Sequence, residues 1–252
     1  MKRIVSAVTI AIGVLGTIAT VYTMPDGFAH NAFVMALSML ALIGLFSLLS
    51  QEVDLLSAWS VLRQSKRLGI RRINDTGHGN SNCSQMANAK NIRIMAVSGN
   101  AVIKSRKSEI ISALRNQKAF IRILLAQPNS QFVSDVESAE SLHRMGQISP
   151  EISGVEKLLH EYVAEAASGK GAEEIGKVKI GHYSTQLRTS LILCDESWGW
   201  LTLNLAPKRA MQCVSLELSR VDNGLMVDCI NHFDKCWEIV EQRNQAFQIL
   251  LT

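Results

Sequence analysis

The residue types that most often carry chemistry in proteins are spread thinly along this chain. The cysteines are odd in number and form no C-x-x-C pair; they are Cys83, Cys194, Cys213, Cys229 and Cys236. Structural zinc sites are commonly built on close cysteine pairs, and disulfide frameworks need even numbers of cysteines. We therefore expect no metal site, no cofactor and a reducing compartment.

The C-terminal part of the chain must supply the scaffold for any site. Its apolar and polar residues alternate in the pattern of an α/β domain over residues 89–252. Apolar runs at 92–97 and 120–126 predict two strands, with a helix over 105–116 between them. A strand, a helix and a strand in so short a stretch form a βαβ unit with two parallel strands. Further apolar patterns predict a helix at 153–167, strands at 177–182, 189–194, 199–205 and 213–219, and a last helix at 225–242.

One stretch within this domain resembles a known motif. The strand 188–195 (RTSLILCD) ends in Asp195 and is followed by the T-L-N of residues 202–204 and by Pro207-Lys208-Arg209. This order is similar to the phospholipase D-like superfamily, in which H-x-K-x-x-x-x-D precedes a G-S-x-N turn. The resemblance covers residues 88–243 and implies a phospholipase D-like α/β domain.

The resemblance also implies that the catalytic residues of that family are missing. A family member uses the histidine as nucleophile and the lysine to stabilise phosphate charge. Arg188 stands at the histidine position and Ser190 at the lysine position, and no histidine of the chain has a lysine two residues later. The resemblance therefore implies no catalytic residue, but a degenerate phosphate pocket made of Arg188, Ser190, Asp195, Asn204 and Arg209. The alternative is that Arg188 pairs with a carboxylate and that Asp195 only ends a strand.

The N-terminal part is of a different character. Residues 4–23 and 32–50 contain no charged side chain, and each stretch is about as long as a helix that crosses a bilayer. Met24-Pro25-Asp26-Gly27 lies between them and predicts a tight turn. We therefore expect a transmembrane hairpin over residues 1–50, the alternative for residues 1–23 being a cleaved signal peptide.

The charge distribution orients this hairpin. The net charge is +4, and residues 1–72 hold seven basic and three acidic groups, so the remaining 19 basic and 19 acidic groups cancel. Basic residues that flank apolar spans mark the cytoplasmic side. We therefore expect a membrane protein with both termini in the cytoplasm, and not a nucleic-acid-binding face spread over the domain.

Two more features concern the membrane. The small residues Thr9, Gly13, Gly16 and Thr17 lie on the first span, where they would let helices approach closely, within one chain or between chains. Residues 51–88 are expected to form a helix along the membrane surface and then a linker. Anionic headgroups would contact its basic side chains, which are Arg63, Lys66, Arg67, Arg71 and Arg72.

These observations favour a membrane-anchored effector or sensor. A two-span hairpin joined to a degenerate domain resembles the two-transmembrane effectors of bacterial anti-phage systems, including those of retrons. The resemblance implies a location in the bacterial inner membrane. It also implies the lipid bilayer, self-association and a regulatory protein–nucleic acid complex, such as a reverse transcriptase with its RNA or DNA, as partners. Two alternatives stay open, a passive membrane scaffold and a divergent phosphodiesterase that uses His182 or His160 as its nucleophile.

Overall fold

The structure is a computed structural model, and it describes residues 62–74, 84–140, 146–185, 189–204, 212–243 and 246–249. The chain divides into two compact units, Met1–Gln64 and Ser65–Thr252. Both predicted spans, with Thr9, Gly13, Gly16 and Thr17, lie outside the described residues. Within those described ranges, no helix combines the length and the apolar character needed to cross a bilayer.

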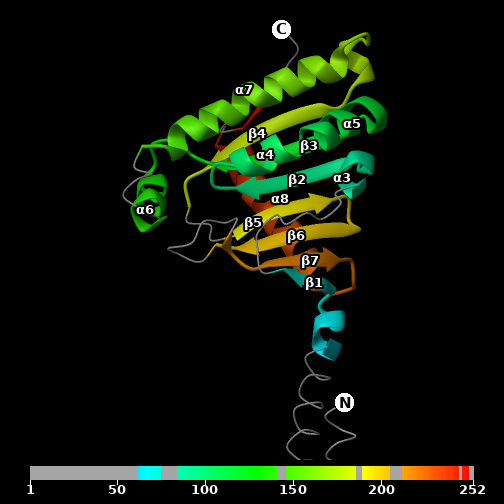
Figure 1. Cartoon of the computed structure of the whole chain (residues 1–252), viewed down its shortest axis with the longest axis vertical. Coiled ribbons are helices and arrows are strands. Elements are labelled where there is room, and N and C mark those ends of the chain that lie inside the picture. The colour runs from blue at the N-terminus through cyan, green and yellow to red at the C-terminus, as the bar shows by residue number, and fades with distance from the viewer. Residues whose placement is uncertain are drawn as a thin grey trace, which may run out of the picture. The chain divides into compact units, whose positions relative to one another are not determined.

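A mixed eight-stranded sheet forms the centre of the second unit (Figure 1). Strands β2, β3 and β4 are parallel to one another, and every other neighbouring pair is antiparallel. Helices α4 and α5 connect β2 to β3, which confirms the predicted βαβ unit. Across the sheet the strands lie in the order β1 (Ile70–Asn74), β7 (Ser215–Ser219), β6 (Trp198–Leu203), β5 (Thr189–Cys194), β2 (Asn91–Ala96), β3 (Phe120–Ala126), β4 (Lys177–Tyr183) and β8 (Ala246–Ile249).

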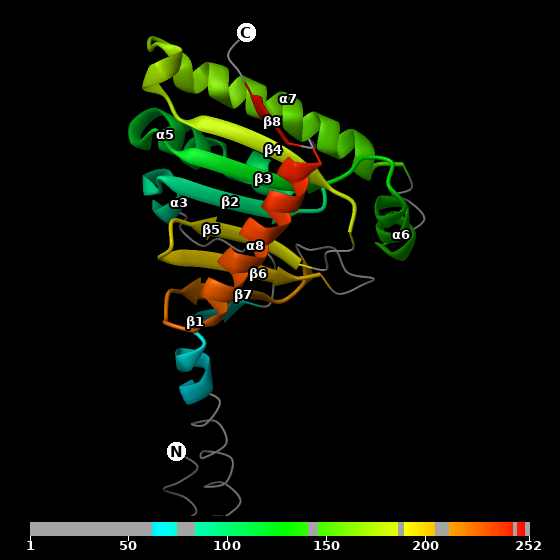
Figure 2. The ribbon, with the colours of Figure 1, turned by 180° about the vertical axis from the view of Figure 1, so that it is seen from behind.

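Helices cover both faces of this sheet. Figures 1 and 2 show α4, α5 and α7 on one face and α8 crossing the other. A short 3₁₀ helix, Ala172–Glu174, precedes β4. The helices are α3 (Ser84–Asn88), α4 (Asn100–Ser105), α5 (Lys107–Gln117), α6 (Gln131–Glu140), α7 (Ile148–Ala167) and α8 (Leu225–Gln242).

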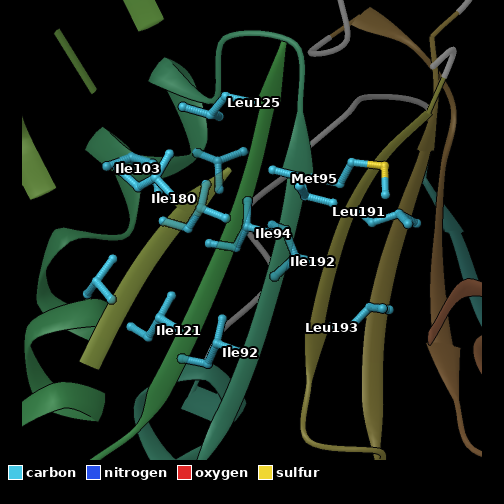
Figure 3. Packing of buried hydrophobic residues seen from close by; sticks show 14 of the residues in the cluster. Ile92, Ile94, Met95, Ile103, Ile121, Leu125, Ile180, Leu191, Ile192 and Leu193 are labelled. Carbon is cyan, nitrogen blue, oxygen red and sulfur yellow. The ribbon is translucent and has the colours of Figure 1, made fainter. Parts of the chain in front are cut away.

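The core lies where apolar residues of the three parallel strands meet these helices. Figure 3 shows Ile92, Ile94, Ile121 and Ile180 on neighbouring strands beside Ile103 of α4, and all five side chains are fully buried. Strands buried on both faces read as continuous apolar runs, which is why β3 was recognisable as FIRILLA in the sequence.

The opposite face is packed by α8. Gly181 lies under this helix, and a Cβ atom there would come within 2.7 Å of Val240 Cγ1. The missing side chain lets α8 approach β4 closely. Phe233 and Trp237 of the helix stack with ring centroids 6.1 Å apart.

Several predictions about the elements were wrong. Arg71 and Arg72, expected on the basic helix, lie in β1, which pairs with β7 at the edge of the sheet. Both β1 and α3 precede residue 89, the expected start of the domain, and belong to the unit that begins at Ser65. Helix α6 and strand β8 had not been predicted.

Candidate functional site

Four small polar residues form a row across four neighbouring strands. Ser190 of β5 lies opposite Thr202 of β6, Thr202 opposite Ser215 of β7, and Ser215 opposite Asn74 of β1. Opposed residues of antiparallel strands project from the same face, with Cβ atoms about 5 Å apart. We call these four residues the polar row.

Three of the four residues of the polar row are buried, and the polar atoms of the row are incompletely satisfied. Ser190 is 5% exposed, and Thr202 and Ser215 are fully buried. Asn204 donates from Nδ2 to Ser190 Oγ at 3.3 Å. Within the described part of the chain, the buried atoms Thr202 Oγ1 and Asn74 Nδ2 have no hydrogen-bond partner, and the same holds for Trp200 Nε1 and Asn204 Oδ1 beside the row.

This lack of partners is unusual for a folded protein. Most buried polar atoms are hydrogen-bonded, and an unsatisfied one costs about 1–3 kcal/mol. Three of the four unpartnered groups, Asn74 Nδ2, Trp200 Nε1 and the Thr202 hydroxyl, can donate a hydrogen bond. The row is therefore chemically suited to a ligand that offers several acceptor oxygens.

The sequence of β6 explains why polar and apolar groups meet here. Alternation along the strand puts Trp198, Trp200, Thr202 and Asn204 on one face. The two indole rings lie 6.2 Å apart, and Trp198 Nε1 donates to Glu217 Oε1 at 3.1 Å. The face thus changes along β6 from an aromatic part to a polar part that begins at Thr202.

Of the residues predicted for a phosphate pocket, the structure brings Ser190 and Asn204 together. Ser190 and Asn204 are hydrogen-bonded to each other, as a shared site requires. Arg188 and Arg209 lie outside the described residues. Thr202, Ser215 and Asn74 were missed, although the alternation through Trp198 and Trp200 already indicated the face on which Thr202 lies.

Asp195 needs a correction, because it lies at the other end of β5 from Ser190. The two residues are five positions apart along the strand, which corresponds to about 16 Å. The Asp195 carboxylate accepts hydrogen bonds from the backbone N–H groups of Lys90 and Asn91 at 3.0 and 2.8 Å. It therefore fixes the turn after β5 to the start of β2, which is the alternative considered for it.

The histidines considered as nucleophiles lie away from the polar row. His182 is on β4, three strands from Ser190, or about 14 Å at the usual strand spacing. Its Nε2 atom is 3.0 Å from Glu156 Oε1, an ion-pair distance without hydrogen-bond alignment. His160 is exposed on α7. His182 is therefore too far from Ser190 and Thr202 to act on a ligand that they hold.

A second polar region is an open cleft of about 520 Å³ beside α4 and α5. Two of its cations, Lys107 and Arg115, are already engaged. Lys107 Nζ lies 2.8 Å from Glu165 Oε2, and the pKa of Lys107 is raised by its hydrogen bond to Glu165. Arg115 donates to the backbone carbonyls of Glu165 and Ala166 at the end of α7. The cleft is lined by Lys104, Ser105, Lys107, Ser108, Ile111, Ser112, Arg115, Asn116 and Glu165.

Metal ligands do not cluster in the part of the chain that the structure describes. No group of three or more histidine, cysteine, aspartate or glutamate side chains is placed there to hold an ion. The polar row itself contains hydroxyl and carboxamide groups, which are weak ligands compared with carboxylate, imidazole and thiolate.

Comparisons with known proteins add a similarity to solved structures. No family model matches the chain, and no curated protein matches it. Among solved structures, the chain is similar to a phospholipase D family member, Nuc from Salmonella typhimurium, with 12% sequence identity and a TM-score of 0.38. The match covers 70% of this chain and 97% of that chain. It concerns the arrangement of helices and strands, and no site residue is transferred from it.

Proposed function

We propose that this chain is a membrane-anchored effector or sensor whose α/β domain binds a phosphate-bearing ligand at the polar row. In this proposal the two N-terminal segments span the bacterial inner membrane. They disrupt it when a trigger binds to the domain or when an inhibitory partner leaves it.

The buried, unpartnered hydroxyl of Thr202 is the observation that carries the proposal. A hydroxyl in this position costs stability in the free protein, and a valine would fill the same space without that cost. A ligand with acceptor oxygens would satisfy it together with Asn74 Nδ2 and Trp200 Nε1. Proteins commonly tolerate such local costs where function requires them.

The same geometry supports binding over phosphodiester hydrolysis. Asp195 is held by two backbone N–H groups at the far end of β5. Ser190 is engaged by Asn204, and a neutral serine hydroxyl supplies neither a nucleophilic imidazole nor a cation. A domain of this kind can recognise a phosphate group of a regulatory protein–nucleic acid complex without cleaving it.

The experiment is to express the full chain in bacteria and to follow the inner-membrane potential with a potential-sensitive dye, together with propidium entry. The wild-type chain is compared with Gly13→Arg, which places a charge in the first predicted span, and with Thr202→Val in the polar row. Membrane abundance of all three is matched by quantitative blotting. Lys157→Gln, at an exposed position on α7, serves as the control.

We expect the wild-type chain to depolarise the membrane and Gly13→Arg to abolish the effect, because an arginine in a span is costly in lipid. Thr202→Val is expected to change how depolarisation depends on the ligand of the polar row, and to leave the spans intact. Depolarisation that persists in Gly13→Arg would contradict the role given to the spans. A wild-type chain that leaves the potential intact, even after phage infection of the bacteria that express it, would favour the passive scaffold.

A further inference from the structure

The N-terminal edge of the sheet carries an exposed surface that is both basic and apolar. Its residues are Lys66, Arg67, Leu68, Arg71, Arg72 and Ile73, which we call the β1 edge patch. All six side chains are exposed, including Leu68 at 45% and Ile73 at 60%. Large apolar side chains exposed beside cations are typical of surfaces that contact lipid.

The cations of the patch form no ion pair with a described carboxylate, although the strand register places Arg72 opposite Glu217 of β7. Residues 62–74 contain no aspartate or glutamate, and among the described residues no carboxylate pairs with Lys66, Arg67, Arg71 or Arg72. Cations elsewhere in the domain, such as Lys107 and Lys179, do have carboxylate partners. The patch is therefore a concentrated positive charge on a chain whose remaining part, from residue 73 onward, is neutral overall.

The patch is also fixed to the domain by backbone hydrogen bonds. Leu225 N donates to Leu68 O at 3.0 Å, and Ser219 N donates to Gly69 O at 2.8 Å. Gly69 has a φ of 75° and would bring a Cβ atom to 2.3 Å from Ser219 O, so this tight connection requires glycine. Whatever binds the patch therefore sets the orientation of the whole sheet.

We infer that the β1 edge patch docks the domain onto the anionic surface of the bilayer. The inference rests on the proposed membrane anchorage, because the second predicted span ends at residue 50 and β1 begins at Ile70. Lysine and arginine side chains bind anionic headgroups, while Leu68 and Ile73 enter the boundary between headgroups and acyl chains. Docking would cover the open edge of β1, which Figure 1 shows outermost beside β7.

A second copy of the chain is a less suitable occupant for this edge. Antiparallel pairing of β1 with another β1 would bring Arg71 and Arg72 of one chain next to the same residues of the other. Like charges opposed across strands are destabilising, and edge strands use charge to prevent such pairing. An anionic surface complements the same two arginines.

The test is hydrogen–deuterium exchange on the full chain in two kinds of nanodisc, one of phosphatidylcholine alone and one with phosphatidylglycerol added. We expect the amides of residues 68–74 to exchange roughly tenfold more slowly in the anionic nanodiscs, because docking covers the strand edge. The amides of β8, at the opposite edge of the sheet, should exchange at the same rate in both lipids.

Two double variants with the same net charge make the comparison specific. Arg71→Glu/Arg72→Glu should abolish the difference between the lipids. Lys157→Glu/Lys235→Glu, at exposed positions on α7 and α8, should retain it. Retention of the full lipid dependence by the arginine variant would overturn the inference, and so would equal exchange of residues 68–74 in both lipids with the wild-type chain.

A failure of the anchorage itself would be seen separately. A chain washed from membranes by alkaline carbonate would contradict the predicted spans, whereas a chain that stays in the membrane but shows no lipid dependence would contradict only the docking. Slower exchange that depends on protein concentration and not on lipid charge would indicate pairing of two chains and would overturn the inference.

Discussion

Ser190 and Thr202 face each other at directly opposed positions of β5 and β6, and both side chains are buried. Apolar or aromatic residues occupy the next positions of this face on the two strands, Ile192 and Trp200. The pair thus marks the point where a hydrophobic sheet face becomes polar. Asn204 extends the polar part by its hydrogen bond to Ser190.

Replacement of Thr202 by valine should stabilise the free protein. Valine matches threonine in shape and removes a buried hydroxyl that has no partner, so we expect the free energy of unfolding to rise by about 1 kcal/mol. Urea unfolding measures this change. Thr189→Val, at a partly exposed site on β5, is the control and should change the free energy of unfolding by less than about 0.5 kcal/mol. If Thr202→Val instead lowers the free energy of unfolding by more than about 0.5 kcal/mol, the Thr202 hydroxyl is satisfied and the prediction is contradicted.

Replacement of Asp195 by alanine should destabilise the fold. It removes the acceptor for two backbone N–H groups and puts alanine at a φ of 52°, so a loss of about 2–3 kcal/mol is expected. Asp195→Asn should lose less, because asparagine tolerates this backbone conformation and keeps an acceptor oxygen. Thermal unfolding of the two variants compares them, and equal losses would contradict the role given to this side chain.

Asp234 of α8 holds two arginines of the sheet. It lies 3.0 Å from Arg93 Nε and 2.9 Å from Arg122 Nη2, and burial lowers the pKa of Arg122. Asp234→Ala would leave both guanidinium groups partly buried without a carboxylate, and we expect a loss of about 3 kcal/mol. Asp228→Ala, on the same helix without such a pair, is the matched control in urea unfolding, and similar losses in both variants would contradict the prediction.

Stability should also fall at alkaline pH through Cys229. Burial raises the pKa of this thiol from 9.0 to about 11. The folded state holds the thiol proton of Cys229 more tightly than the unfolded state. The contribution of this group to the free energy of unfolding is therefore fully present below pH 9 and is lost as the pH rises toward 11. Urea unfolding from pH 8 to 11 measures the loss, and Cys229→Ala should show a shallower decline over this interval; identical slopes would contradict the assignment.

The sequence was sufficient to predict most elements that have a strong local pattern. β3 and α8 were recognisable because continuous apolar runs and helical spacing are properties of short stretches. β1 was missed because its IRRIN sequence is exposed at the edge of the sheet and gains its strand structure from pairing with β7. Such pairing is a tertiary effect that local pattern does not contain.

The same limit applies to the site. Ser190 and Asn204 could be predicted because they lie near each other in a motif-like segment. Asn74 joins Ser215 and Thr202 only through the strand order β1-β7-β6-β5, which connects residues far apart in the chain. Asp195 was misplaced because its place in the motif does not reveal that Ser190 lies near the start of β5 (Thr189–Cys194) and Asp195 just past its end.

The most direct test of the account is whether the polar row binds phosphate. Thermal unfolding of the full chain in detergent is measured with inorganic phosphate and with chloride at equal ionic strength, for the wild type and for Ser190→Ala/Thr202→Val. A ligand that binds only the folded state raises its unfolding temperature. We predict that phosphate stabilises the wild-type chain and has no such effect on the double variant. Equal shifts in both proteins, or no shift in the wild type with either inorganic phosphate or a 5′-phosphorylated oligonucleotide, would contradict the account.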